Sequence, residues 1–333
     1  MNFYKLIKLN HSIKNHRLKF LGIYLLHITK RRYLAVHFDP INACNLRCKM
    51  CYFTDKNYVK NLKGIFPENE IDYLGKSFFK RAIKLQIGCG TEPTLYKNVN
   101  EIIKTASKYK VPYISLTTNA NLLTKETVKE WVVNGLSEIT VSLHGVTKES
   151  YESMMTKGDF DKFINALKII TELKKTHPVV LRINYTFNED NFEELASFYT
   201  VFNDYDIDIL QIRPITKLGD TEYNNFSLEK VIPLYDNINK ILIDESTKRN
   251  VKLLSHNPSQ LNNRVSIDSV INKYIYCYIS PTSLFRKDFK WNNDTYDSYA
   301  KRTLLKKDIL KDMCSSKAEL MKHTSDKLNY EIN

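Results

Sequence analysis

The sequence lacks an apolar stretch long enough to cross a membrane. The mostly apolar run from Phe20 to Ile28 has nine residues, whereas a helical membrane span needs about 20. A small-residue cleavage site, which a secretory signal would carry, is also missing. We therefore expect a cytoplasmic protein, with peripheral membrane association as an alternative because this run lies in a basic segment.

Acidic residues are absent from the first 33 positions, which contain eight Lys or Arg. The 333-residue chain has a net charge of +13, whereas its central part, residues 34–300, carries only +2. Nucleic-acid binders usually cluster basic charge on one face of their fold, so a nucleic-acid partner is not expected. Residues 1–32 form a basic N-terminal arm. We favour a helix packed on the main domain, and the alternative is an amphipathic helix on an anionic membrane.

Cysteine is scarce, and the six in this chain do not suit the disulfide scaffold of a short secreted protein. Three of them, Cys44, Cys48 and Cys51, follow the pattern C-x3-C-x2-C. Clustered cysteines in the cytoplasm more often bind metal or carry out redox chemistry. A structural zinc site needs four ligands, and no second C-x2-C pair is present. A cubane iron–sulfur cluster held by three cysteines would instead leave its fourth iron open to a second molecule.

Hydrophobic residues make up 43% of the chain, which is enough to bury a sizeable core. Short apolar segments rich in β-branched and aromatic residues predict strands. Helical patterns separate them, and this alternation favours parallel strands joined by helices. In such folds reactive groups gather at the C-terminal ends of the strands, where the cysteine run also lies. The predicted strands are residues 33–38, 85–89, 113–118, 138–143, 181–187 and 208–215.

Four segments predict helices. Thr124 is a suitable N-cap and Gly135 a suitable stop for the first of them. Residues 160–175 place apolar side chains at the helical period. Helices are also expected over 191–203, with Asp190 as the N-cap, and over 233–244. From about residue 255 onward the sequence is weakly patterned and no elements are assigned.

The cysteine run and five later segments together resemble the radical S-adenosylmethionine (SAM) superfamily. That family has C-x3-C-x2-C on the loop after the first strand of a partial (βα)6 TIM-like barrel, an α/β fold. In order along this chain, the later segments are similar to the family's motifs at the ends of the second to sixth strands. They read "GCGTEP" (88–93), "TTNA" (117–120), "VSLHG" (141–145), "RINYTF" (182–187) and "QIRPI" (211–215). The resemblance covers residues 33–216 and leaves 217–333 as a C-terminal extension that closes the barrel or binds substrate.

The resemblance implies that Cys44, Cys48 and Cys51 bind a [4Fe-4S] cluster whose open iron chelates SAM. The residues that it implies for SAM binding lie at the ends of the predicted strands or just after the cysteine run. Glu92 would mainly support the turn that presents its motif to the SAM amino group. Beside it, the set comprises Tyr52, Gly88, Gly90, Asn119, Ser142, Arg182 and Arg213.

Several positions depart from the family's pattern. Cys89 interrupts the glycine motif, and His144 stands where the family usually has aspartate. Met155 occupies the expected position of an arginine that pairs with the SAM carboxylate, so Lys157 or Arg182 is expected to replace it. Many relatives carry a cysteine-rich auxiliary-cluster domain at the C-terminus. Here only Cys277 and Cys314 are available, and we interpret both as ordinary cysteines.

By resemblance, an electron from a reductase such as flavodoxin or ferredoxin would cleave SAM to methionine and a 5′-deoxyadenosyl radical. That radical would abstract hydrogen from a substrate that the sequence does not identify: a peptide, a sugar-containing molecule or another small metabolite. The C-terminal extension would set that choice. The alternative is a non-catalytic metal-binding module, with a distant fourth ligand, that contacts nucleic acid or membrane through its basic arm.

Overall fold

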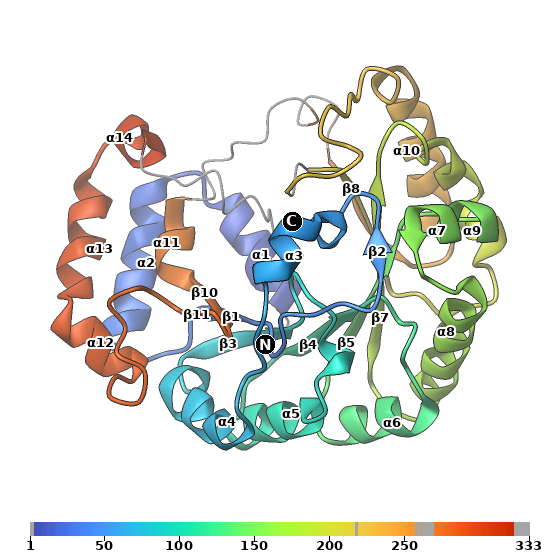
Figure 1. Ribbon diagram of the computed structural model, residues 1–333. Helices are drawn as coiled ribbons and strands as arrows, with labels where there is room; N and C mark the ends of the chain where they lie inside the picture. The colour runs from blue at the N-terminus through green and yellow to red at the C-terminus, as the bar shows by residue number, and fades with distance from the viewer. Residues whose placement is uncertain (1–2, 217–218, 257–260, 262–269, 323–333) are drawn as a thin grey trace.

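The computed structural model describes residues 3–216, 219–256, 261 and 270–322. Its centre is a curved sheet with helices along the outside (Figure 1). The strand order is β11-β10-β1-β3-β4-β5-β7-β8-β9, and all neighbouring pairs are parallel except β10 and β11. This confirms the predicted partial α/β barrel. The strands are β1 (Leu34–Phe38), β3 (Ala82–Ile87), β4 (Ile114–Thr118), β5 (Glu138–Leu143), β7 (Val180–Phe187), β8 (Ile209–Pro214), β9 (Lys252–Leu254), β10 (Tyr276–Ser280) and β11 (Ser283–Leu284).

The two faces of the sheet differ in polarity because side chains alternate along each strand. On one face, Val36, Leu116 and Val141 are fully buried in the hydrophobic core under the helices. On the other face polar side chains meet across the barrel interior, as where Gln86 donates to Thr117 over 2.9 Å. The helices that connect the strands are α4 (Ile71–Leu74), α5 (Val99–Lys108), α6 (Lys125–Val133), α7 (Lys148–Met154), α8 (Phe160–Lys174), α9 (Phe198–Val201) and α10 (Ile232–Lys248).

Local sequence signals place several elements accurately. Helix α6 begins after Thr124, whose hydroxyl accepts a hydrogen bond from the backbone N–H of Thr127. Gly135 follows its end with a φ of +112°, a left-handed conformation that favours glycine. Strand β3, in contrast, begins three residues earlier than predicted and ends at Ile87.

The single helix predicted over 191–203 is wrong. The structure has a 3-10 helix, Glu193–Ser197, followed by the short α9. Asp190 is not the N-cap, because the side chain of Asn188 accepts the backbone N–H groups of Asp190 (2.8 Å) and Asn191 (3.1 Å). The apolar face that suggested the helix, including Phe192 and Leu195, is nevertheless buried.

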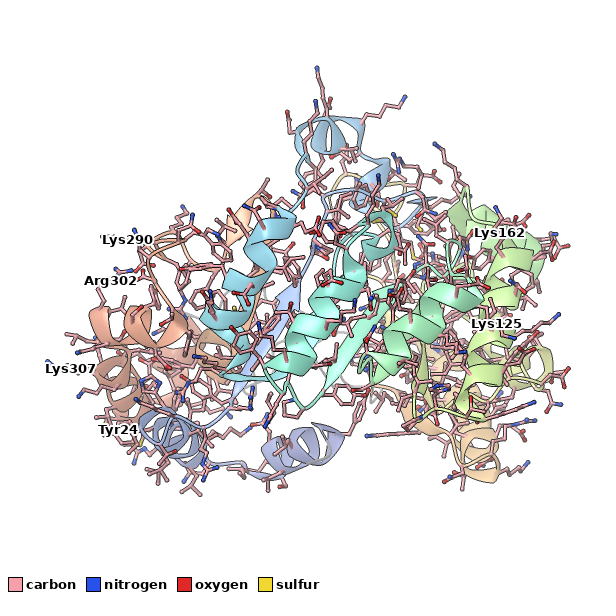
Figure 2. All side chains as sticks on the ribbon, turned by 90° about the horizontal axis from the view of Figure 1, so that it is seen from below. Tyr24, Lys125, Lys162, Lys290, Arg302 and Lys307 are labelled. Atoms are coloured by element: carbon pink, nitrogen blue, oxygen red, sulfur yellow. The ribbon has the colours of Figure 1, made fainter. Side chains whose placement is uncertain are left out.

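The N-terminal arm forms two helices, α1 (Phe3–Ser12) and α2 (His16–Ile28). Helix α1 lies at the end of the barrel opposite α3 (Lys56–Asn61), as the two views in Figures 1 and 2 agree. Helix α2 packs beside α13, with Phe20 fully buried and edge-to-face with Tyr274 at 5.8 Å. Helix α2 therefore packs on the main domain through its buried side, which is the interpretation that the sequence favoured.

The C-terminal extension continues the sheet at both edges. Strand β9 pairs with β8, and β10 pairs with β1 in the register Val36 to Cys277. The remaining helices of the extension follow these strands along the outside. They are α11 (Asn272–Ile275), α12 (Tyr296–Arg302), α13 (Leu305–Cys314) and α14 (Lys317–Lys322). Within the described ranges, no helix has both the length and the apolar character needed to span a membrane.

Candidate functional site

The three clustered cysteines lie on the loop that follows β1. Cys48 belongs to the two-residue strand β2 (Arg47–Cys48), which pairs antiparallel with β6 (Met155–Thr156). The backbone N–H of Lys49 also donates to the Met154 carbonyl over 2.9 Å. The cysteine loop is therefore fastened to the segment after α7 and lies over the C-terminal ends of the strands.

The thiols themselves fit an iron–sulfur cluster in their surroundings. All three are free and partly exposed. Burial raises the pKa of Cys44 to about 12 and raises the pKa of both other thiols, while the Arg47 guanidinium works against this at Cys44 and Cys51. The backbone N–H of Leu46 donates to the Cys44 sulfur over 3.4 Å. Hydrogen bonds of this kind to the sulfurs are a feature of iron–sulfur sites.

Binding a metal centre would release the thiol protons, because thiolates are the ligands. In a cubane each cysteine ligates its own iron, so the three sulfurs need not converge on a single point. Across the described ranges, no three His, Cys, Asp or Glu side chains are grouped as ligands of one metal ion. The arrangement is thus compatible with a cluster that is spread across the loop.

The glycine motif after β3 is held by a buried carboxylate that sequence reasoning missed. Asp39, which directly follows β1, accepts the backbone N–H groups of Cys89 (2.6 Å) and Gly90 (3.1 Å) and the hydroxyl of Thr91 (3.1 Å). Tyr278 of β10 donates to the same carboxylate over 2.8 Å. Burial raises the pKa of Asp39, and these donors oppose that shift. The only sequence signal was an acid placed at a strand end next to a proline.

Glycine occupies tightly packed positions on both sides of Cys89. Gly88 has a φ of +79°, and a Cβ there would lie 2.5 Å from the Thr117 carbonyl oxygen. A Cβ on Gly90 would lie 2.6 Å from the Tyr52 hydroxyl, which donates to the Gly90 carbonyl. Tyr52 therefore packs directly on the motif from the end of the cysteine loop.

Glu92 is a buried support for the neighbouring turns. Its carboxylate accepts the hydroxyls of Thr94 (2.6 Å) and Thr118 (2.7 Å) and the backbone N–H of Asn119 (2.8 Å). It joins the loops after β3 and β4. With these three donors, the carboxylate acts on the shape of the site by positioning both loops.

Asn119 connects the loop after β4 to the cysteines. Its side-chain amide donates to Asn45 Oδ1 over 2.8 Å and lies 3.9 Å from the Cys44 sulfur. Its Oδ1 accepts the backbone N–H of Asn121 over 3.0 Å. The residue is buried, so its orientation relative to the cysteine loop is fixed.

Ser142, His144 and Arg213 lie toward the C-terminal ends of β5 and β8. The Arg213 guanidinium donates to Thr186 on β7 over 3.1 Å. His144 Nδ1 is buried and has no hydrogen-bond partner among the residues that the structure describes. Burial and the positive charge of Arg213 lower the pKa of His144 to about 4, so this imidazole is neutral near pH 7.

Arg182 lies in a different environment from the one expected. It is the third residue of β7, and its guanidinium donates to Asn184 (2.9 Å), to Tyr4 of α1 (3.0 Å) and to Gln211. Four residues of strand, about 13 Å, separate it from Thr186 near the cysteine end. The structure thus places Arg182 in a network with Tyr4, Asn184 and Gln211 toward the N-terminal end of the barrel.

Lys157, the other expected carboxylate partner, follows β6 directly and is exposed with a φ of +72°. Met155, at the position where relatives carry arginine, is buried and pairs with Cys48 across β2 and β6. Of the two basic candidates, Lys157 is therefore the one beside the cysteine loop.

The other three cysteines are separate from this loop. Cys89 lies 3.4 Å from His37 Nδ1 on β1. Cys277 is fully buried in the core on β10, and Cys314 is exposed at the end of α13. Both C-terminal cysteines are free thiols.

Comparisons of the sequence with known proteins give matches to one enzyme superfamily. Residues 38–199 match the sequence profile of the Radical SAM superfamily. A probable GTP 3',8-cyclase of Methanocaldococcus jannaschii is 29% identical over 284 residues, which are 85% of this chain and 89% of that protein. A probable GTP 3',8-cyclase of Saccharolobus islandicus is 26% identical over 180 residues, covering 52% of this chain and 55% of that protein.

Among solved structures, Streptococcus suis SuiB bound to S-adenosylmethionine is similar with a TM-score of 0.60. The match covers 80% of this chain and 68% of SuiB at 17% sequence identity. At that identity the similarity supports only the fold, which is the partial barrel described above.

Proposed function

We propose that this chain is a radical SAM enzyme, because residues 38–199 match the Radical SAM superfamily, a family that uses a [4Fe-4S] cluster and SAM, and that Cys44, Cys48 and Cys51 hold the cluster. When bound, cluster and SAM supply a 5′-deoxyadenosyl radical for hydrogen abstraction. The observation that carries this proposal is the position of the three thiols, on one loop fastened over the C-terminal strand ends. A reductase of the flavodoxin or ferredoxin class would provide the electron.

We assign SAM contacts to the residues that surround this loop. We place the SAM amino group beside the backbone of Gly88 and Gly90, because neither residue carries a side chain that could hold a ligand away. Tyr52 would cover the adenosyl group from the cysteine side. Asn119 and Ser142 offer polar side chains for the ribose or carboxylate.

The remaining candidates divide by position. Arg213 lies at the end of β8, where the adenine is expected, and Lys157 replaces Arg182 as the proposed carboxylate partner. Glu92 contributes by positioning the loops after β3 and β4. The polar barrel interior below these residues would orient the substrate and shield the radical from water.

For the substrate we propose GTP or a closely related purine nucleotide. The support is the similarity to the Methanocaldococcus jannaschii protein, which extends over 89% of that protein's length and so includes part of the C-terminal extension. Peptides and sugar-containing metabolites are the competing substrate classes.

The cluster and SAM cleavage are tested first. Anaerobic reconstitution with iron and sulfide should give about four irons per chain, and adding SAM should change the electron paramagnetic resonance of the reduced cluster. Reduction should then release 5′-deoxyadenosine. Stoichiometric zinc without either response would instead support the non-catalytic metal-binding module.

The substrate is tested separately. With GTP deuterated on the ribose, deuterium should appear in 5′-deoxyadenosine, and a new nucleotide product should be detected by mass spectrometry. If SAM is cleaved but no deuterium transfers from GTP, the radical SAM assignment stands and the substrate assignment fails. Peptides and sugar nucleotides would then be assayed in the same way.

A further inference from the structure

Helix α2 has two apolar stripes on opposite sides, and only one of them faces the protein. Phe20 and Ile23 are buried against the domain. The second stripe points away from it and consists of Leu18, Leu21, Leu25 and Ile28, whose exposed fractions are 55%, 39%, 49% and 48%. Spacings of three, four and three residues keep these four side chains on one helix face.

Such a stripe is unusual for a protein surface. Single exposed leucines are common, whereas a continuous row marks an interaction site. From Leu18 to Ile28 the row extends about 15 Å at the helical rise. Helix α2 lies at the outer edge of the molecule beside α13, where Tyr24 and Lys307 are labelled in Figure 2. The stripe is therefore exposed on the outside of the molecule.

Basic side chains flank the stripe at both ends. Lys14 and Arg17 precede or begin it, Lys30 and Arg31 follow it, and all four are exposed. No acidic residue occurs before Asp39 in the sequence. An exposed apolar row between cationic ends matches the boundary between acyl chains and anionic headgroups.

We propose that this face of α2 docks the protein on an anionic phospholipid bilayer, with Leu18, Leu21, Leu25 and Ile28 inserted at the interface. The basic residues at the two ends would contact headgroup phosphates. A nucleic acid would bind the basic residues but would leave the apolar stripe exposed to water. The combination of the stripe and the basic residues therefore favours a lipid surface. The inference concerns a surface separate from the cysteine loop and does not depend on the proposed reaction.

The test uses the full-length reconstituted protein and vesicles of two compositions. It should co-sediment with vesicles of equal phosphatidylglycerol and phosphatidylcholine, and at least tenfold less with pure phosphatidylcholine vesicles. Raising NaCl to 0.5 M should weaken binding because the headgroup attraction is screened. Leu21→Glu combined with Leu25→Glu should reduce partitioning at least tenfold, because two inserted apolar side chains are lost.

A matched variant controls for the added charge. Val133→Glu with Ile243→Glu changes two exposed apolar residues on α6 and α10 by the same net charge and should leave vesicle binding unchanged. Circular dichroism and SAM-cleavage activity should be preserved in both double variants. Absence of binding to the anionic vesicles, or equal loss in the control variant, would overturn the proposal. So would a dimer that the α2 variant dissociates, since the stripe would then be an interface between copies.

Discussion

Tyr278 of β10 donates a hydrogen bond to Asp39 over 2.8 Å, and Asp39 in turn holds the loop between β3 and the helical turn at Pro93. The two residues are 239 positions apart in the sequence. Through this contact the C-terminal extension supports the motif to which we assign the SAM amino group. The strand β10 is thus part of the site's framework as well as an edge addition to the sheet.

Replacing Asp39 by asparagine should weaken SAM binding at least tenfold. The side chain would keep its size, but its amide nitrogen would face at least one of the present donors, from Cys89, Gly90, Thr91 or Tyr278. Charge-assisted hydrogen bonds contribute about 1.5–3 kcal/mol each, and about 1.4 kcal/mol corresponds to tenfold in affinity. Equilibrium binding of SAM to the anaerobically reconstituted protein measures the effect. Asp161→Asn, an exposed change on α8, should bind SAM like the wild type.

Replacing Tyr278 by phenylalanine should have a smaller effect in the same direction. One donor to Asp39 is lost while the three from the loop remain, so only part of the about 1.5–3 kcal/mol of this charge-assisted hydrogen bond should reach the SAM site, and a weakening of SAM binding by about two- to tenfold is expected. An unchanged SAM affinity together with an unchanged thermal midpoint would show that β10 does not support the loop.

Cys48→Ala should abolish the cluster and SAM cleavage while leaving most of the fold intact. The three assigned cysteines would bind one iron each, so losing one leaves too few ligands for a stable cubane. Iron content and the absorbance near 400 nm report the cluster, and circular dichroism reports the fold. Cys314→Ala provides the control, because this exposed thiol at the end of α13 is separate from the loop. Retained cleavage in Cys48→Ala would refute the ligand assignment.

The parts of this structure that depend on local patterns could be read from the sequence. Strand and helix alternation predicts the barrel, and the sequence places the cysteine loop directly after β1. Asp39 and Tyr278 escaped notice because their contact joins distant segments and neither residue belongs to a recognisable motif. Strand β10 lies in the weakly patterned sequence after residue 255, where no strand was predicted.

Arg182 shows a second limit of sequence reasoning. The predicted strand 181–187 makes Arg182 its second residue and so places it near the start of the strand, but the sequence pattern does not show which groups its guanidinium contacts. The partners that decide this, Tyr4 and Gln211, come from the N-terminal arm and from β8. Knowledge of α1 was needed to place the residue.

Tyr4→Phe should destabilise the protein without changing SAM affinity. The Tyr4 hydroxyl donates to Glu138 and accepts from Arg182, at the barrel end opposite the cysteines. Burial raises the pKa of Glu138, but Lys84 and Arg182 outweigh it and hold that pKa below the usual range. In Tyr4→Phe this charged network loses the hydroxyl that bridges Glu138 and Arg182. We expect the free energy of unfolding to fall by about 1–2 kcal/mol. Urea unfolding and SAM binding, measured on the same preparation, separate the two effects. A weakened SAM affinity at unchanged stability would contradict this placement of Tyr4.

The pH dependence of stability should reveal two buried neutral histidines. Burial, with a contribution from Lys84, lowers the pKa of His37 to about 3, and burial together with Arg213 lowers that of His144 to about 4. Below pH 6.5 the unfolded chain therefore binds protons that the folded chain does not, so the free energy of unfolding falls as the pH is lowered.

Between pH 7.5 and 5.5 each histidine should account for a loss of about 1.4 kcal/mol. Each single variant, His37→Asn or His144→Asn, should lack the pH-dependent loss of unfolding free energy that its histidine causes. The double variant should lack both losses. His37→Asn keeps a side chain able to hydrogen-bond Cys89, which lies 3.4 Å from His37 Nδ1, so its effect on packing is small. Urea unfolding of the wild type and the variants should be compared at both pH values under anaerobic conditions. Any pH effect of a bound cluster is common to all of them and drops out of the differences. Equal losses in all four proteins would mean that neither imidazole is neutral and buried in the folded state.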